Sequence, residues 1–264
     1  MSQRKRYPTD LSDACWAKLS AYFPDKGVGT AGRRRRWSRR EIVNAIFYVL
    51  KSGCAWRLLP GDFPAWQTVY DYFRRWTSDG TWQALHDALR EQARLSAGRA
   101  ASPSAAILDA QTVKLHAAQG LERGYDAGKK TLGRKRHLLV DTLGLIWGVI
   151  VHSAGIQDAA GAKPVLKIAR KCCPRLLKIW ADGAYNAQKL IAWVKRYCPG
   201  ALEIVSKPKD AKGFVLLPKR WIVERTFGWL IQNRRLAKDY EKLPENSVAF
   251  ILIAMIPIML RISR

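Results

Sequence analysis

The sequence predicts an α/β fold in which a mixed sheet with packed helices follows a smaller, all-helical unit. Before residue 96, apolar side chains recur at the three- and four-residue spacing of helix faces. After residue 105, short apolar segments alternate with helical ones, which is typical of a sheet flanked by helices. The stretch between them consists of small and polar residues with one proline, as linkers do. We therefore expect a helical domain at 1–95, a linker at 96–105 and an α/β domain at 106–264.

Four helices are expected in the first domain, at residues 12–22, from Ser38 to Ser52, from near Pro64 onward and at residues 81–95. The second has the clearest limits. Ser38 and Glu41 form a capping box just before an apolar run, and the glycine after Ser52 is typical of a helix C-terminus. Several short helices in a basic segment favour a helix-turn-helix-like unit.

The second domain is expected to contain short strands, a β-hairpin and several helices. A strand at 106–108 ends at Asp109, and a strand at 177–181 ends at Asp182. The remaining expected elements are a hairpin of 137–140 with 145–151, helices at 158–172 and 187–197, a strand at 202–205 and a long helix at 219–236 that carries Glu224.

Net charge indicates the kind of partner. Lys and Arg number 46 and Asp and Glu number 21, which gives a formal net charge of +25. A folded chain with this imbalance repels itself unless a polyanion neutralises it, and each phosphate contact by Lys or Arg releases condensed counterions. Nucleic acid is therefore the expected partner. A membrane surface fits less well, because no helix separates basic and apolar faces cleanly.

Cysteine usage and apolar runs indicate the compartment. Five cysteines without a C-x-x-C pair fit a reducing environment with no disulfide framework and no zinc site. No apolar segment follows the basic N-terminus, so no signal peptide is expected. The longest apolar run, residues 248–260, is 13 residues long, short of the roughly 20 that span a bilayer. We expect a buried helix there, bent or broken by Pro257, in a cytoplasmic, nucleoid-associated protein without membrane contact.

Three acids form the candidate catalytic site. Asp109 and Asp182 each follow an apolar strand, and carboxylates at the ends of neighbouring strands converge. Glu224 lies on a helix whose apolar side can pack on the sheet. Clustered carboxylates are tolerable when they hold hard cations such as Mg²⁺ or Mn²⁺. Two such ions about 3.5–4 Å apart can clamp the attacking and leaving oxygens of phosphoryl transfer.

Simpler interpretations exist for each acid taken alone. An Asp at a strand end is most often a turn or cap residue. A Glu on a basic helix is most often an ion-pair partner, here of Arg220 or Arg225. The order of strand end, strand end and helix in a very basic chain favours the catalytic interpretation.

The motifs around these acids resemble those of the insertion-sequence-5 group of bacterial DDE transposases, over nearly the whole chain. The matching segments are WQTVY (66–70), ILDAQTVK (107–114), RGYDAGKK (123–130), GRKRH (133–137), WADGAY (180–185), RWIVERTF (220–227), NRR (233–235) and KDYE (238–241). The chain departs from the family pattern at Ala110, at Ala184 and in Asp158-Ala159-Ala160.

The resemblance implies a ribonuclease-H-like catalytic fold with Asp109, Asp182 and Glu224 as the DDE acids. It implies a transposase that binds the terminal inverted repeats of its element, cleaves there and joins 3′-hydroxyl ends to target DNA. Two Mg²⁺ or Mn²⁺ ions and double-stranded DNA are the expected cofactors and partner, with no small-molecule cofactor. Action on two ends favours a homodimer on DNA. The alternatives are a catalytically inactive repeat-binding regulator and a metal-dependent nuclease without strand transfer.

Basic residues near the two predicted functional units are candidates for phosphate contacts. Six arginines lie within the eight positions 33–40, which end in the first turn of the second helix, and further cations lie between the first acid and the hairpin or close to Glu224 in sequence. A solvated charged surface is the alternative for each group, and an ion pair to Glu224 is the alternative for Arg220. The DNA-binding candidates are Arg33, Arg34, Arg35, Arg36, Arg39, Arg40, Lys129, Lys130, Arg134, Lys135, Arg136, Arg220, Arg234 and Arg235.

Overall fold

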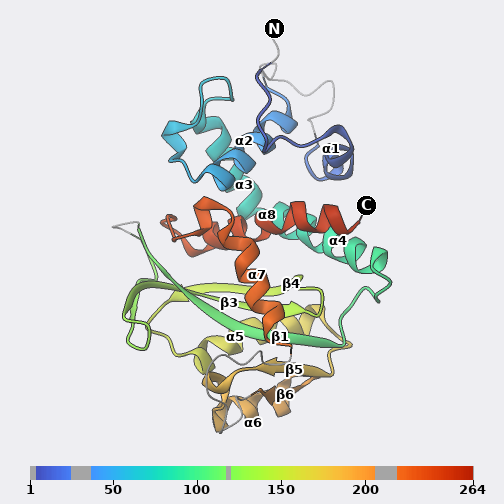
Figure 1. Ribbon diagram of the computed structural model, residues 1–264, viewed down its shortest axis with the longest axis vertical. Coiled ribbons are helices and arrows are strands. Elements are labelled where there is room, and N and C mark those ends of the chain that lie inside the picture. Colours follow the sequence, from blue (N-terminus) through green and yellow to red (C-terminus); the bar gives the residue numbers. More distant parts are fainter. Residues whose placement is uncertain (1–3, 25–36, 117–119, 206–218, 264) are drawn as a thin grey trace.

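The computed structural model describes residues 4–24, 37–116, 120–205 and 219–263. A helical part lies at the top of Figure 1, and a sheet with flanking helices lies below it. The first part contains α1 (Asp13–Leu19), α2 (Arg39–Ser52), α3 (Trp66–Ser78) and α4 (Thr81–Ser96), with 3-10 turns η1 (Ser20–Tyr22) and η2 (Trp56–Leu58). These helices lie where the apolar spacing predicts them.

The ends of α2 follow from local chemistry. The Ser38 hydroxyl accepts a hydrogen bond from the Glu41 backbone N–H at 3.3 Å, which satisfies one free donor of the first turn. The Glu41 carboxylate pairs with the Arg4 guanidinium at 2.6 Å, so the expected capping box is only half formed. At the other end, Gly53 adopts a φ of 72°, the left-handed conformation that glycine accepts without strain.

The second part contains a six-stranded mixed sheet in the order β2-β3-β1-β5-β6, with β4 also paired to β3. β1 is antiparallel to β3 and parallel to β5, and β5 is parallel to β6. This arrangement confirms the predicted α/β class. The strands are β1 (Ala105–Lys114), β2 (Gly124–Asp126), β3 (Thr131–Asp141), β4 (Ile146–Ser153), β5 (Lys178–Ala181) and β6 (Ala201–Ile204).

β1 and β3 are longer than their predicted apolar segments. Their polar halves pair with each other, from Asp109 opposite Leu138 to Lys114 opposite Gly133. Because the second half of β1 is polar, the apolar pattern predicts only the part of the strand up to Leu108. Asp109 therefore lies inside a strand, and its predicted position at a strand end is wrong.

The helices of the second part cover both faces of the sheet (Figure 1). The strands alternate between faces: Ile107 and Leu138 join a core with α7 and α8, whereas Leu108 and Leu139 join a core with α5. The expected helix at 219–236 ends at Ile231 and is followed by a separate 3-10 turn. The elements are α5 (Asp158–Cys172), α6 (Gln188–Tyr197), α7 (Trp221–Ile231) and α8 (Pro244–Ile262), with η3 (Gly183–Tyr185) and η4 (Arg234–Leu236).

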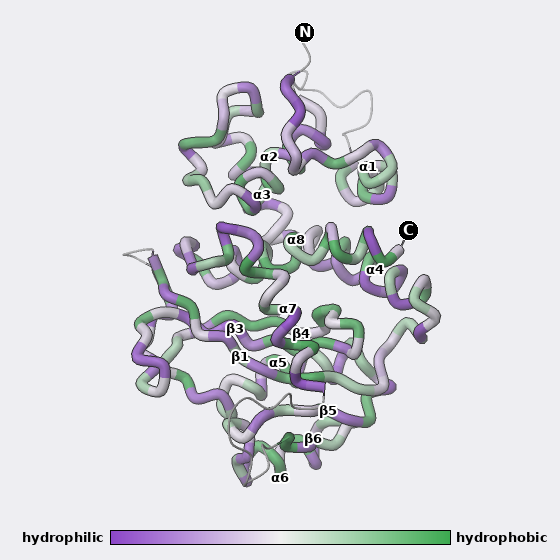
Figure 2. Tube along the Cα trace, in the orientation of Figure 1, coloured by the Kyte–Doolittle hydropathy of each residue, from purple (hydrophilic) through white to green (hydrophobic). Residues whose placement is uncertain are grey.

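Helix α8 joins the helical part to the sheet. Its apolar residues share one core with α2, α3 and α4 and with the sheet face under α7, and the run is visible in the hydropathy colouring of Figure 2. The helix has 19 residues and continues through Pro257, so the expected break there is wrong. Among the described residues it is the one helix long and apolar enough to cross a membrane, and 72% of the relevant window is buried inside the protein. That burial is typical of a core helix.

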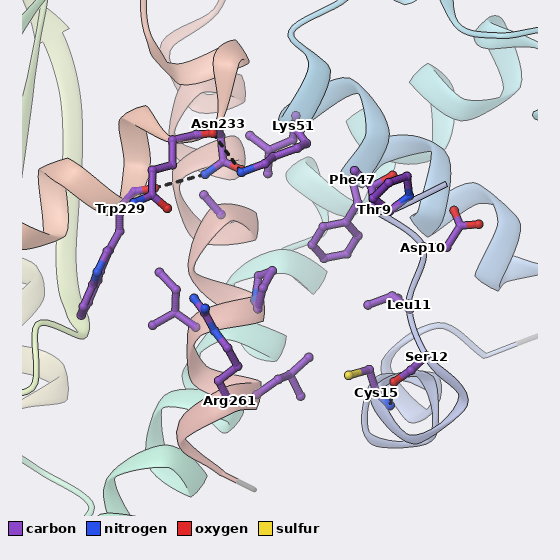
Figure 3. Close-up of a pocket in the computed structure, with 17 residues that line it drawn as sticks. Thr9, Asp10, Leu11, Ser12, Cys15, Phe47, Lys51, Trp229, Asn233 and Arg261 are labelled. Atoms are coloured by element: carbon purple, nitrogen blue, oxygen red, sulfur yellow. Dashed lines mark hydrogen bonds between the residues drawn. The ribbon is translucent and has the colours of Figure 1, made fainter. Parts of the chain in front are cut away.

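A pocket of about 460 Å³ opens between the N-terminal segment, α2, the end of α7 and α8 (Figure 3). Its walls include Leu11, Phe47 and Ile258, and the Lys51 ammonium at its rim donates to the Gln232 carbonyl at 3.0 Å. The described residues that line it include none of the predicted site residues. It lies at the C-terminal end of α7, the opposite end from Glu224.

Candidate active site

Parallel pairing of β1 with β5 brings the two aspartates together. Ile107 is opposite Trp180 in this pairing, so Asp109 and Asp182, two residues further along each strand, lie level with each other. Asp182 follows the last residue of β5 and caps η3, where its carboxylate accepts the Ala184 N–H at 2.9 Å. The predicted convergence of the two side chains thus holds, although only Asp182 marks a strand end.

Helix α7 brings Glu224 over the same edge. Two side chains of the helix contact the turn between β3 and β4. The Arg225 guanidinium donates to the Leu143 carbonyl and the Thr226 hydroxyl donates to the Gly144 carbonyl, both at 2.9 Å. Gly144 has a φ of 85°, and a Cβ atom there would lie 2.9 Å from the Thr226 hydroxyl oxygen. This close approach sets the position of α7, and with it Glu224, against the sheet.

Arg220 lies among the three acids. Its Nη2 atom is 3.3 Å from Asp109 Oδ2, 3.5 Å from Asp182 Oδ2 and 3.7 Å from Glu224 Oε1. One guanidinium nitrogen thus lies close to all three carboxylates. The Nε atom of the same side chain is buried without a hydrogen-bond partner among the described residues. Of the two interpretations of Arg220 from sequence, the ion pair is the one this structure contains, and it extends to all three acids.

The carboxylates differ in their surroundings. The side chains of Asp109 and Asp182 are 14% and 27% exposed, whereas that of Glu224 is 51% exposed. Burial, with a smaller contribution from the nearby Asp182 charge, raises the pKa of Asp109 to about 6, although the Ala110 N–H and Arg220 act in the opposite direction. Asp109 therefore takes up a proton at a higher pH than an exposed aspartate does.

Within the described ranges, no three His, Cys, Asp or Glu side chains lie close enough together to hold a metal ion. The three acids surround the Arg220 guanidinium instead of an open space. Their donor set consists of oxygen atoms only, the chemistry that Mg²⁺ and Mn²⁺ prefer.

Three of the predicted DNA-binding cations are buried in β3, because that strand is longer than expected. Arg134 is fully buried and donates to the carbonyls of Glu241 and Lys242 at 2.8 Å and to that of Leu121. Arg136 donates to the carbonyls of Leu236 and Lys238, and burial lowers its pKa to about 10.

Lys135 is 6% exposed and pairs with Asp158 at 2.8 Å on the other face of the sheet. The expected placement of Arg134, Lys135 and Arg136 on the rim of the site is therefore wrong. Their charged groups bind carbonyl oxygens and the Asp158 carboxylate inside the protein.

The remaining candidates divide into exposed and engaged side chains. Lys129, Lys130 and Arg234 are exposed. Arg235 is 7% exposed and pairs with Glu241 at 2.7 Å, so it too is part of the interior.

At the start of α2, the Arg39 guanidinium lies 4.2 Å from the Tyr72 ring centre, and Arg40 pairs with Asp13 at 2.6 Å. The arginines at 33–36 lie outside the described residues.

One buried acid was missed by the sequence analysis. Asp141 is fully buried at the end of β3 and accepts hydrogen bonds from the N–H groups of Leu143 and Leu145, from the Trp147 indole and from Arg94 of α4. It holds the turn on which α7 rests, so it supports Glu224 indirectly. An Asp just before a Leu-Gly turn is a recognisable turn signal, but its bond to α4 could not be read from sequence.

Two family descriptions match this chain. "Transposase DDE domain" matches residues 100–259, more than half of the chain, and "Putative transposase of IS4/5 family (DUF4096)" matches residues 11–86. The mixed sheet with flanking helices, preceded by a helical part, agrees with the ribonuclease-H-like fold class predicted from sequence.

Two curated relatives from Burkholderia cepacia are similar to this chain. The putative transposase for insertion sequence element IS402 is 25% identical over 126 residues, which cover 45% of this chain and 59% of the relative. An insertion element IS402 uncharacterized 16.2 kDa protein is 32% identical over 112 residues, 39% of this chain and 72% of the relative. The chain thus spans about three fifths of the length of the first relative.

Proposed function

We propose a reaction for this protein, which belongs to the DDE transposases of IS4/IS5-type insertion sequences. The protein binds the terminal inverted repeats of its element, cleaves the DNA at the element ends and joins the 3′-hydroxyl ends to target DNA. Asp109, Asp182 and Glu224 carry the chemistry. The protein acts as a homodimer on double-stranded DNA in the cytoplasm, at the nucleoid.

The observation that carries this proposal is the convergence of three carboxylates on one cationic atom. Two parallel strands and a helix from a distant part of the chain place Asp109, Asp182 and Glu224 within 3.3–3.7 Å of Arg220 Nη2. A structural ion pair needs one acid for one arginine. A second and a third carboxylate around the same charge are unfavourable unless the three acids serve to hold additional positive charge.

A DDE domain implies dependence on a divalent metal. The chemistry of the three acids fits such an ion, because each supplies oxygen ligands and together they surround one positive charge, which in this structure is the Arg220 guanidinium. We propose that two Mg²⁺ or Mn²⁺ ions are held by Asp109, Asp182 and Glu224. When bound, the metal supplies Lewis-acid activation of the attacking oxygen and stabilisation of the leaving one.

The chain's own residues have separate tasks in this proposal. Asp109 and Asp182 are fixed by strand pairing and by the Ala110 and Ala184 N–H groups, so their oxygens keep one orientation. Glu224 is more exposed and can adjust on the first turn of α7. Arg220 would have to leave the centre of the site for the three acids to hold a metal there. It then lies next to the DNA, where its guanidinium can contact a phosphate.

DNA positioning is assigned to exposed cations around this edge and to the helical part. Lys129, Lys130 and Arg234 remain available for phosphate contacts. The arginines at 33–36 and the helices α2 and α3 are proposed to bind the terminal repeat.

The test is a cleavage and joining assay with a labelled duplex that carries the element's own end and a supercoiled target, in Mg²⁺ or in EDTA. The variant is Asp182→Asn, and its matched control is Glu203→Gln, an exposed carboxylate on the adjacent strand β6. We expect Asp182→Asn to abolish metal-dependent nicking and joining while DNA binding is retained, and Glu203→Gln to keep wild-type activity.

The outcomes separate the alternatives. Cut products without joined products would support a nuclease without strand transfer. Tight binding of the wild type with no cleavage in either Mg²⁺ or Mn²⁺ would support a repeat-binding regulator, and the catalytic assignment would be wrong.

A further inference from the structure

Helices α5 and α6 form a strongly basic surface on the sheet face opposite α7. The two helices pack on the core that contains Leu108 and Leu139, whereas Asp109 and α7 belong to the other face. Their sequences contain a single acid, Asp158. The cations of this surface are Lys163, Lys167, Arg170, Lys171, Lys189, Lys195 and Arg196.

The one acid does not neutralise these cations. The Asp158 carboxylate pairs at 2.8 Å with the buried ammonium of Lys135, which comes from β3 beneath the helix. Within the described part of the chain, none of the seven surface cations lies within salt-bridge distance of a carboxylate. By contrast, α3 and α4 carry Asp71, Asp87 and Glu91 among their arginines. The α5–α6 surface is therefore a local excess of positive charge within an already basic protein.

The surface is also hollowed. An open pocket of about 710 Å³ lies between the helices and is lined by Lys167, Arg170, Lys171, Trp193 and Tyr197. The Trp193 and Tyr197 rings contact each other at 5.5 Å between ring centres, and the Arg196 guanidinium lies 5.3 Å from the centre of the Tyr197 ring. The aromatic rings thus form an apolar wall beside three exposed cations, which can approach one anionic group together.

A polyanion matches this arrangement better than a small anion. Seven cations spread over two helices exceed what one phosphate can neutralise, whereas a DNA backbone presents a phosphate at regular intervals along the surface. Because the aromatic rings already contact each other and Arg196, the exposed charges are the groups available to a ligand. Contacts of this kind carry no sequence information.

We propose that the α5–α6 surface binds the phosphate backbone of a DNA duplex without sequence preference, separately from the DNA at the three carboxylates. The inference rests on the proposed function, since it takes DNA as the substrate. The surface lies across the sheet from α7, so the duplex bound there is a segment other than the one being cut. The joining of an element end to unrelated target DNA involves DNA that extends beyond the reacting phosphate, and a surface without sequence preference suits such a flanking segment.

The test measures DNA binding in EDTA, where no cleavage occurs. Fluorescence anisotropy of a labelled duplex without terminal-repeat sequence is followed from 50 to 300 mM salt, with the triple variant Lys167→Gln/Arg170→Gln/Lys171→Gln. Each lost phosphate contact should reduce the slope of log K against log[salt] by about 0.9, so the triple variant should reduce it by roughly 2.7. All three side chains are exposed, so the melting temperature should stay that of the wild type.

Two controls make the result specific. Lys178→Gln removes an exposed cation of the neighbouring strand β5 whose ammonium pairs with Glu203 at 2.8 Å, and its slope should equal that of the wild type. Lys167→Arg/Lys171→Arg keeps both charges and should keep the slope. An unchanged slope in the triple variant overturns the inference, as does an equal loss per charge in Lys178→Gln, which would indicate a net-charge effect only. If the wild type itself does not bind DNA, the proposed function fails and not this surface alone.

Discussion

The arginines inside β3 and the cations on α5 and α6 carry the same charge but differ in role, because the former bind backbone carbonyls and the latter face solvent. Arg134 and Arg136 are fully buried, and their guanidinium groups donate to five carbonyl oxygens of the segments that pack against the sheet. Lys167 and Arg170 are exposed and have no acid or carbonyl partner among the described residues. The position of a cation relative to free backbone carbonyls, more than its residue type, thus decides whether it stabilises the fold or remains available to a ligand.

The largest expected effect is loss of a buried guanidinium. Arg134→Met removes the donor of the Glu241 and Lys242 carbonyls and the cation that lies 3.3 Å from the Asp239 carboxylate. Removal of one partner from a buried pair costs about 3–5 kcal/mol. We expect a decrease of that size in the free energy of unfolding, measured by urea denaturation. Arg170→Met is the control and should change it by less than about 0.5 kcal/mol. Equal effects of the two variants would contradict the comparison.

A buried histidine pair should make stability depend on pH. His137 and His152 share a hydrogen bond of 2.8 Å, and the Tyr185 ring packs on His137. The charged neighbours of the pair are Lys135 of β3, Asp158 of α5 and, for His152, Glu122. Burial lowers the pKa of His137 to about 3, whereas in an unfolded chain it is about 6.5. As pH falls below about 6.5, the unfolded chain binds a proton that the folded protein does not.

Stability should therefore decrease by about 2 kcal/mol for His137 between pH 7 and pH 5. Because burial also lowers the pKa values of His152 and His86, the quantity to measure is the difference between wild type and His137→Gln. Glutamine retains an N–H donor for the Asp158 carbonyl. Urea midpoints at the two pH values should differ less in the variant, and identical pH slopes would show that His137 does not contribute.

Arg220 is intermediate between the two groups of cations, because it is 18% exposed and its partners are carboxylates and not carbonyls. Its charge repels any metal that enters the site. Repulsion between unit charges about 4 Å apart is worth roughly 1–4 kcal/mol in this kind of environment. We expect Arg220→Gln to bind Mn²⁺ at least about tenfold more tightly without DNA, measured from the electron paramagnetic resonance signal of free Mn²⁺. Arg234→Gln is the matched control, and weaker Mn²⁺ binding by Arg220→Gln would contradict the proposed displacement.

The smallest expected effect concerns an exposed pair. Lys178 and Glu203 lie 2.8 Å apart on β5 and β6 with side chains 47% and 50% exposed. Exposed pairs contribute about 0–1 kcal/mol, since water already solvates both charges. Lys178→Gln should therefore lower the urea midpoint very little. A loss as large as that of Arg134→Met would mean that burial does not separate the two classes of cation.

The acids of the candidate site were predictable because local pattern and chain order both pointed to them. Asp182 follows a short apolar strand and Glu224 lies on an amphipathic helix, signals that do not depend on distant contacts. The cations were not equally predictable. Lys135, Arg136 and Lys129 lie close together in sequence, yet only Lys129 is exposed. The difference arises from the pairing of β3 with β1, which no periodicity of the charged residues reveals.

The sequence alone determined the fold class, the helical part before the sheet and the family, and it proposed the three acids as the site, because these depend on apolar periodicity, turn chemistry and local motifs. The tertiary structure alone decided which arginines are interior, that Arg220 lies among all three carboxylates, and that α8 joins the helical part to the sheet in one core. Burial and ion pairing depend on contacts between segments far apart in the chain. A charged side chain has the same local signature whether a carbonyl from a distant segment or water receives its hydrogen bonds.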